Sequence, residues 1–222
     1  MSKTIQLTAA DGHQFAAYEA GDPSAKRGLV VVQEIFGVNH HIRHVCDRLA
    51  AFGYHIVSPA MFDRTERGVE LGYQPDDIQR GIALRAKIAD AGALADIAAC
   101  AAYLNNKPTG IIGYCWGGTL SWQAATQLNS FKAASCWYGG GIAATATATP
   151  NCPVQMHFGA EDHGIPLSDV DIIKSAHPGM HIFVYDGAGH GFGCNERASY
   201  NPAEAELAEL RSLAFFAAHL RA

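Results

Sequence analysis

A short glycine-flanked segment carries a cysteine that is suited to nucleophilic catalysis. Cys115 lies in residues 113–118 (GYCWGG), between an apolar run at 110–112 and a helix-compatible run at 119–127. A Gly-x-Cys-x-Gly turn between a strand and a helix is the cysteine form of the nucleophile elbow. Side chains at the two glycines would collide with neighbouring elements, and the N-terminus of the following helix favours a thiolate. By itself, the segment also fits a structural turn with a core cysteine.

Two further polar residues complete a pattern that fits acyl transfer. Asp162 and His190 each follow a run of β-forming residues, and His190 is flanked by two glycines. The order Cys115, Asp162, His190 is that of nucleophile, acid and histidine in α/β-hydrolases. The histidine would take the thiol proton and deliver it to a leaving group, while the aspartate would orient the imidazole. Glu161 competes for the acid role, but the spacing Gly-x-x-Asp favours Asp162.

The elements that must position these residues alternate along the whole chain. The predicted strands are 4–9, 15–19, 28–34, 54–59, 110–114, 133–137, 154–158 and 181–185, and the predicted helices are 39–52, 75–89, 93–104, 119–127, 167–176 and 202–220. This order predicts an α/β-hydrolase fold, with a mostly parallel central sheet, helices on both faces and an N-terminal β-hairpin. Ligands of such sheets bind beyond the carboxyl ends of the strands, where the reactive residues lie. We expect a single domain over residues 1–222.

Composition narrows the class of protein. The formal charge is −5 without a basic stripe, which argues against nucleic-acid binding. No apolar segment has the length of a signal peptide core or a membrane span, so we expect a cytoplasmic protein without membrane contact. The six cysteines show no metal-type spacing, and the strict Gly-x-Gly-x-x-Gly nucleotide motif is absent. We expect no cofactor and no metal, a small lactone or ester as the partner, and a monomer or weak oligomer.

A glutamate stands at an unexpected place. Glu34 ends a β-branched run that is typical of a strand buried on both faces, and a buried carboxylate is costly unless it is paired. The plain alternative is that its side chain reaches solvent at the strand end. In an α/β-hydrolase, the next residues form the oxyanion loop. The backbone N–H groups of Ile35 and Trp116 would then bind the oxygen of a tetrahedral intermediate.

Together these segments resemble the dienelactone hydrolase (carboxymethylenebutenolidase) family. The resemblance rests on residues 33–39 (QEIFGVN), 113–118 (GYCWGG), 159–162 (GAED) and 189–192 (GHGF), and it extends over nearly the whole chain. It implies hydrolysis of an enol-lactone, such as a dienelactone to maleylacetate, in the catabolism of (chloro)aromatics. It also implies that Cys115, Asp162 and His190 form the triad, and that Glu34 partners the resting thiol and helps to deprotonate it.

Family members that act on dienelactone hold the substrate carboxylate with two arginines. Arg80 fits the first position best, and Arg85 is its rival. The second arginine follows the catalytic histidine by four residues, where this chain has Cys194, while Arg197 stands three positions later. Arg64, on the segment 60–74, is a further candidate for an anionic substrate. The alternative function is therefore a related hydrolase of a different lactone or ester that lacks the double-arginine clamp.

Two other interpretations remain open at this stage. One is a non-catalytic binding protein of the hydrolase fold, although such a scaffold has no need of Glu34 or His190. The other concerns His40, His41 and His44, of which the first and last have helical spacing compatible with a metal. Without a third converging ligand, we interpret these histidines as a solvated helix face.

Overall fold

One eight-stranded sheet runs through the whole molecule. The structure is a computed structural model that describes residues 2–104 and 107–221. The strands lie in the order β1-β2-β4-β3-β5-β6-β7-β8, with antiparallel pairing of β1 with β2 and of β2 with β4, and parallel pairing elsewhere. Their bounds are β1 (Lys3–Thr8), β2 (Gln14–Ala20), β3 (Arg27–Val32), β4 (Tyr54–Pro59), β5 (Thr109–Tyr114), β6 (Ala133–Trp137), β7 (Val154–Gly159) and β8 (His181–Tyr185). The predicted α/β arrangement with an N-terminal hairpin is confirmed.

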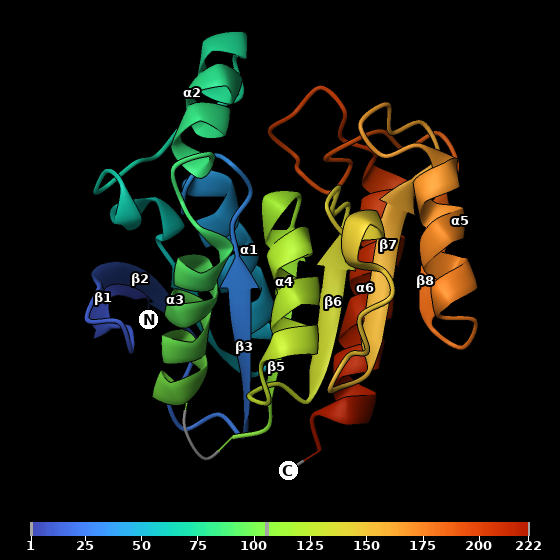
Figure 1. Ribbon diagram of the computed structural model, residues 1–222. Coiled ribbons are helices and arrows are strands. Elements are labelled where there is room, and N and C mark those ends of the chain that lie inside the picture. Colours follow the sequence, from blue (N-terminus) through green and yellow to red (C-terminus); the bar gives the residue numbers. More distant parts are fainter. Residues whose placement is uncertain (1, 105–106, 222) are drawn as a thin grey trace.

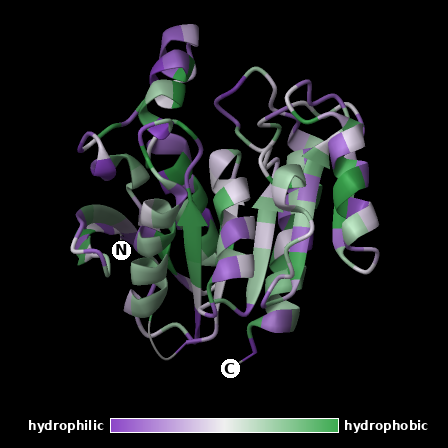
Figure 2. Ribbon diagram, viewed as in Figure 1, coloured by the Kyte–Doolittle hydropathy of each residue, from purple (hydrophilic) through white to green (hydrophobic). Residues whose placement is uncertain are grey.

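Helices cover both faces of this sheet. In Figure 1, α3 and α4 lie on the near face, α1 and α6 lie behind it, and α2 projects above the body. The helices are α1 (His40–Ala51), α2 (Pro75–Arg85), α3 (Asp90–Tyr103), α4 (Trp116–Gln127), α5 (Leu167–Ala176) and α6 (Pro202–His219). Strand β3 is apolar over most of its length, whereas α2 carries several hydrophilic residues (Figure 2). Strands covered on both faces are mostly apolar, and the buried Gln155 and His157 of β7 are exceptions.

Most predicted boundaries hold, and one pair of helices differs. The helix that begins at Pro75 ends at Arg85 rather than near residue 89, and the next helix begins at Asp90 rather than Ala93. Between them, Ile88 is buried and its N–H donates to the Arg85 carbonyl, which is the bond of a tight turn. A buried side chain and a reversal of the chain direction therefore end the first helix early.

The segment 60–74, expected to be irregular, contains a single 3-10 turn, Met61–Arg64. Another such turn spans Ala143–Thr145. Among the described residues, the structure holds no helix with the length and hydropathy required to cross a bilayer.

The sheet topology brings the reactive segments to one edge. The last residue of β5, Tyr114, pairs with Trp137 of β6, and the last residue of β7, Gly159, pairs with Tyr185 of β8. Because these four strands are parallel neighbours, the loops that follow them leave the sheet at the same edge. Side chains from residues far apart in the sequence can therefore meet there.

Candidate active site

Cys115 sits on a strained turn between β5 and α4. Its backbone has φ 56° and ψ −115°, a left-handed region that non-glycine residues rarely adopt. The elbow is crowded: a Cβ atom at Gly113 would lie 2.0 Å from the Gly117 carbonyl oxygen, and one at Gly117 would lie 2.3 Å from the Val32 carbonyl oxygen. The Cys115 N–H donates to the Trp137 carbonyl at 2.9 Å. The glycines thus let helix, strand and turn approach closely enough to present the thiol.

His190 links the thiol to a buried carboxylate. Its Nε2 lies 3.1 Å from Cys115 Sγ, and its Nδ1 lies 2.7 Å from Asp162 Oδ2. The other carboxylate oxygen of Asp162 accepts hydrogen bonds from two loop N–H groups, those of Gly164 and Ile165. Glu161, the competing acid, is exposed, whereas Asp162 is buried. The three side chains therefore stand in the order that nucleophile, base and orienting acid require.

The electrostatics of this chain of contacts favour a charged imidazole. Burial alone would lower the pKa of His190, but the hydrogen bond that its ring donates to Asp162 and the contact with Cys115 outweigh it and raise the pKa to about 10. Ser199 Oγ donates to the His190 carbonyl at 2.7 Å and so fixes the loop that carries the ring. The Nε2 side of this ring therefore faces the Cys115 sulfur within hydrogen-bond reach.

Two backbone donors flank the thiol at the positions predicted for an oxyanion hole. Ile35 follows β3, and Trp116 is the first residue of α4, where backbone N–H groups lack partners within the helix. Neither N–H donates a hydrogen bond to another of the described residues. Helix α2 packs directly on this loop, since a Cβ at Gly81 would lie 2.1 Å from the Ile35 carbonyl oxygen. Both donors are therefore fixed in place and free to bind an oxygen.

Glu34 is fully buried, and its partner is a cation. Its Oε1 lies 3.3 Å from Nη1 of Arg197, whose guanidinium lies over the rings of Phe36 and Tyr73 at 5.6 and 6.0 Å. Among the described residues Oε2 has no hydrogen-bond partner, and Glu34 makes no hydrogen bond to Cys115. The solvent-exposed alternative for Glu34 is thus wrong. A buried ion pair holds this carboxylate, in which charge and hydrogen bonding offset the cost of burial.

The three arginines predicted to bind substrate fall in different places. The cleft at Cys115 and His190 has a volume of about 390 Å³, and Arg85 lines it. Arg80 instead pairs with Glu66 at 2.6 Å on the exposed surface. The five-residue offset between these positions on α2 corresponds to a rotation of about 140° around the helix, so they face different directions.

Arg64 is held elsewhere by two carboxylates. Its guanidinium donates at 2.7 Å to the fully buried Asp96 and at 2.8 Å to Asp11. Neither Arg64 nor Arg80 lines the cleft, because each guanidinium is drawn to acidic side chains outside it. Arg85 is the arginine of the predicted set that the structure brings to the thiol.

The structure adds two features to the predicted site. Arg197, noted in the sequence three positions beyond the expected arginine, packs against the loop that carries His190; a Cβ at Gly191 would lie 2.4 Å from its Nη1. Tyr138, which follows β6, has φ 37° and packs edge-on against the His190 ring, with 5.3 Å between centroids. In the sequence, Arg197 was marked only by its closeness to His190, and nothing there signalled Tyr138.

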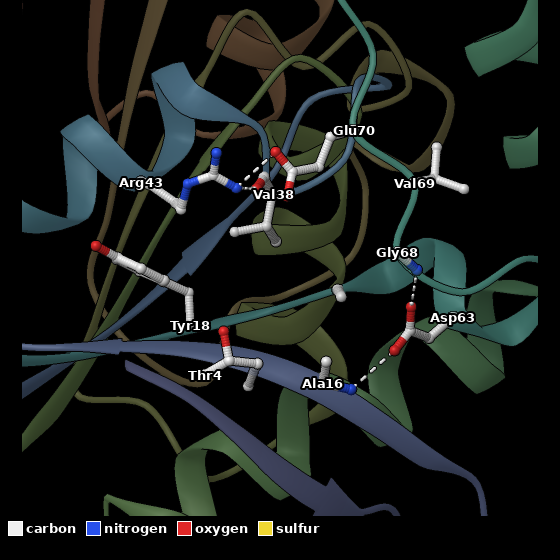
Figure 3. A pocket seen from close by; sticks show the side chains of 11 residues that line it. Thr4, Ala16, Tyr18, Val38, Arg43, Asp63, Gly68, Val69 and Glu70 are labelled. Carbon is white, nitrogen blue, oxygen red and sulfur yellow. Dashed lines mark hydrogen bonds and ion pairs between the residues drawn. The ribbon is translucent and has the colours of Figure 1, made fainter. Parts of the chain in front are cut away.

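A second cavity lies away from the reactive residues. It has a volume of about 160 Å³ and is formed by the N-terminal hairpin, Val38 and the segment around Gly68 (Figure 3). Asp63 accepts hydrogen bonds there from the N–H groups of Ala16 and Gly68, and Arg43 pairs with Glu70 at 2.7 Å. Its charged groups satisfy one another, and it holds no nucleophile.

Comparisons with known proteins agree with this geometry. The model of the dienelactone hydrolase family matches residues 15–220. A candidate carboxymethylenebutenolidase of Synechocystis sp. is 38% identical over 193 residues, which is 78% of each chain. The carboxymethylenebutenolidase of Pseudomonas putida is 31% identical over 231 residues, covering 98% of this chain and 97% of that one. The crystal structure of a candidate dienelactone hydrolase from Klebsiella pneumoniae superposes with a TM-score of 0.83 at 30% identity, covering 98% of this chain and 99% of that one.

Proposed function

The chain belongs to the dienelactone hydrolase family and is a hydrolase of ester or lactone bonds, and on this premise we propose that Cys115 is its nucleophile. The observation that carries the proposal is the continuous chain of contacts from Cys115 Sγ through His190 to Asp162. A thiol in hydrogen-bond reach of a base that is itself oriented by a carboxylate is the signature of covalent catalysis.

The reaction proceeds through an acyl-enzyme. Cys115 Sγ attacks the carbonyl carbon, and the developing oxyanion accepts hydrogen bonds from the N–H groups of Ile35 and Trp116. His190 holds the proton of the thiol and gives it to the leaving enol oxygen as the ring opens. Water then attacks the thioester, His190 takes a proton from that water, and the thiol is restored as the acid leaves. No net proton is gained or lost by the enzyme.

Glu34 and Arg197 add a switch to this cycle. The ion pair keeps Glu34 on Arg197 in the structure. An anionic substrate that binds the Arg197 guanidinium competes for the same hydrogen-bond donors, which frees Glu34 to take the proton of a resting Cys115 thiol and pass it to His190. The family resemblance assigns the glutamate this role, and the single contact at Oε1 is compatible with its release.

The substrate that fits best is a small lactone with a carboxylate. Arg85 lines the cleft and Arg197 lies behind Glu34, so the chain offers two cations although Cys194 occupies the expected arginine position. A dienelactone, opened to maleylacetate, has this chemistry. We propose it as the substrate, with Arg85 and Arg197 as the carboxylate-binding pair in place of Arg80 and Arg64.

A matched substrate pair tests both parts of the proposal. Hydrolysis of dienelactone is compared with that of a lactone of the same ring that lacks the carboxylate. Cys115→Ala is expected to abolish turnover of both, because the nucleophile is lost. Arg85→Gln is expected to raise KM about 10-fold or more for the carboxylate substrate alone, since a charge-assisted hydrogen bond contributes about 1.5–3 kcal/mol.

Arg80→Gln is the control for this arginine, because Arg80 lies on the same helix but faces the surface. Full activity in Cys115→Ala would refute the nucleophile assignment. Equal KM values for the two lactones in the wild-type protein would refute the anionic substrate. The substrate of the same triad would then be a neutral lactone or ester.

A further inference from the structure

Three potential metal ligands converge beside the proposed active site. Glu34, His41 and Cys194 are all buried, and one ligand atom of each lies within 4.8 Å of the others. They come from the end of β3, the first turn of α1 and the loop after His190. Their separation in sequence explains why no metal-type spacing is visible there.

Two of these residues each have a buried polar atom without a partner. Glu34 Oε2 and His41 Nε2 are both buried without a hydrogen bond to any described residue. A buried unpaired acceptor costs about 1–3 kcal/mol, so two of them side by side indicate a missing ligand. The Arg197 contact is at Oε1 and leaves Oε2 free to serve a second cation.

The tautomer of His41 is set for metal binding. Its Nδ1 lies 3.1 Å from Asn195 Oδ1, which is an oxygen that can only accept, so Nδ1 carries the proton. In a neutral ring the lone pair is then on Nε2, which is the ring nitrogen without a hydrogen-bond partner. A second residue that holds the opposite ring nitrogen is the usual support of a histidine ligand.

We propose that Glu34 Oε2, His41 Nε2 and Cys194 Sγ form a binding site for Zn²⁺. A set of carboxylate, imidazole and thiolate suits zinc, whereas Mg²⁺ and Ca²⁺ prefer oxygen ligands alone. Around a tetrahedral zinc, neighbouring ligand atoms lie about 3.5 Å apart, so the three atoms need to close by about 1 Å. Cys194 binds as the thiolate and releases its proton to solvent. A water molecule takes the fourth position.

A cavity lies next to these ligands in the chain. A cavity of about 360 Å³ is lined by Gly193 and Asn195, which flank Cys194 in the chain, and by His44, one turn after His41 on α1. His40, in contrast, pairs with Glu196 at the surface. The interpretation of the three histidines as a solvated face is therefore wrong for His41, the middle one, which points inward.

Occupancy of the site would also slow hydrolysis, a consequence that rests on the proposed function. A zinc ion on Oε2 holds Glu34 in place and keeps it from the proton of Cys115. Zinc would then inhibit the enzyme reversibly without contacting the triad.

Metal binding is tested in the full chain carrying Cys115→Ala, so that the catalytic thiol cannot contribute. Titration with Co²⁺ is expected to give one ion per chain, with thiolate-to-cobalt charge-transfer absorption. Adding Cys194→Ala should remove that absorption and weaken Zn²⁺ binding by at least about 100-fold, because a ligand matters more than the outer-shell contacts that contribute about 10–100-fold. His41→Gln, which keeps the thiol, should weaken Zn²⁺ similarly. Cys100→Ala, another fully buried thiol, is the matched control and should change neither.

The possible outcomes distinguish a failure of the proposed metal site from a failure of the proposed hydrolase function. Charge-transfer absorption that survives Cys194→Ala, or zinc binding as tight in His41→Gln as in its parent, would overturn the site, provided that circular dichroism shows both variants folded. Zinc inhibition of ester hydrolysis that is equal in the wild type and in Cys194→Ala would overturn the inhibitory role. Failure of the wild type to hydrolyse any ester would refute the proposed function, and the cobalt titration would still decide the metal site.

Discussion

Two histidines on neighbouring strands have similar contacts and opposite charge preferences. His157, in β7, has Tyr185 Oη 2.7 Å from Nδ1 and Gln155 Oε1 3.0 Å from Nε2. His190, after β8, is likewise bonded through both ring nitrogens, to Asp162 and Cys115. Burial lowers the pKa of His157 to about 3, whereas the carboxylate and thiol raise that of His190 to about 10. The charge of the partners, rather than the number of hydrogen bonds, distinguishes His190, the proposed catalytic base, from the core residue His157.

The largest expected effect separates the two rings by activity. His190→Gln should reduce ester hydrolysis by about 10²- to 10⁴-fold, since the base and acid of both half-reactions are lost. His157→Gln should leave kcat within about twofold, because a glutamine in the core does not reach the cleft. Steady-state kinetics with an enol ester measure both. Equal losses of hydrolytic activity in the two variants would show that the difference between the two rings has no bearing on catalysis.

The next-largest effect tests whether Asp162 causes the difference in pKa between His190 and His157. Asp162→Asn keeps a side chain of the same shape but removes the charge, so the pKa of His190 should fall toward values typical of a buried neutral ring. Activity should also fall, but less than in His190→Gln, as removing the acid of a triad generally costs less than removing the base. Titration of the His190 ring by NMR measures the pKa directly. A pKa that stays near that of the wild type would assign the shift to Cys115 instead.

This pair also predicts how stability changes with pH. The folded-state pKa of His190 lies above its unfolded value of about 6.5, so its stabilising contribution is complete below that pH and is lost as pH rises toward 10. The difference in free energy of unfolding between wild type and Asp162→Asn should therefore shrink from pH 6 to pH 10. Urea denaturation at several pH values gives this difference, and a gap that widens with pH would contradict the assignment.

Much of this site could be predicted because it depends on local sequence. Cys115, Asp162 and His190 each lie in a glycine-rich turn directly after a strand, and the parallel order of the strands then brings them together. The α/β architecture follows in the same way from the alternation of periodic segments. These features need no knowledge of long-range side-chain partners.

The features that could not be predicted depend on such partners. From the sequence, Arg64 was a further candidate for binding an anionic substrate, but in the structure its guanidinium pairs with Asp96. Arg197 meets Glu34 across 163 residues of sequence, through a loop whose path no periodic pattern determines. His41 differs from its neighbouring histidines only in the direction it faces at the start of α1. In each case the partner, rather than the residue type, decides the role.

A smaller effect concerns the contribution of His157 to the stability of the core. His157→Gln leaves buried polar groups of Tyr185 and Gln155 poorly paired, which should cost about 1–3 kcal/mol at pH 7. The folded-state pKa of His157 lies below the unfolded value, so its contribution is present above about pH 6.5 and is lost as pH falls toward 3. The wild type should lose stability over that range more steeply than the variant. Parallel urea curves at all acidic pH values would show that this ring does not titrate on unfolding.

The smallest effect asks whether the core histidine acts alone. Ser212 Oγ lies 3.1 Å from His157 Nε2 and also accepts from Trp137 Nε1 at 3.2 Å. Ser212→Ala should cost about 1 kcal/mol and leave activity unchanged, because its partners are buried beneath the sheet rather than in the cleft. If these groups form one network, the double variant with His157→Gln should lose less than the sum of the two single losses, by about 0.5 kcal/mol or more. Strict additivity would mean that the contacts of His157 with Tyr185 and Gln155 stabilise the fold independently of Ser212. The core ring would then differ from His190, for which we propose a function that requires Asp162 and Cys115 to act together.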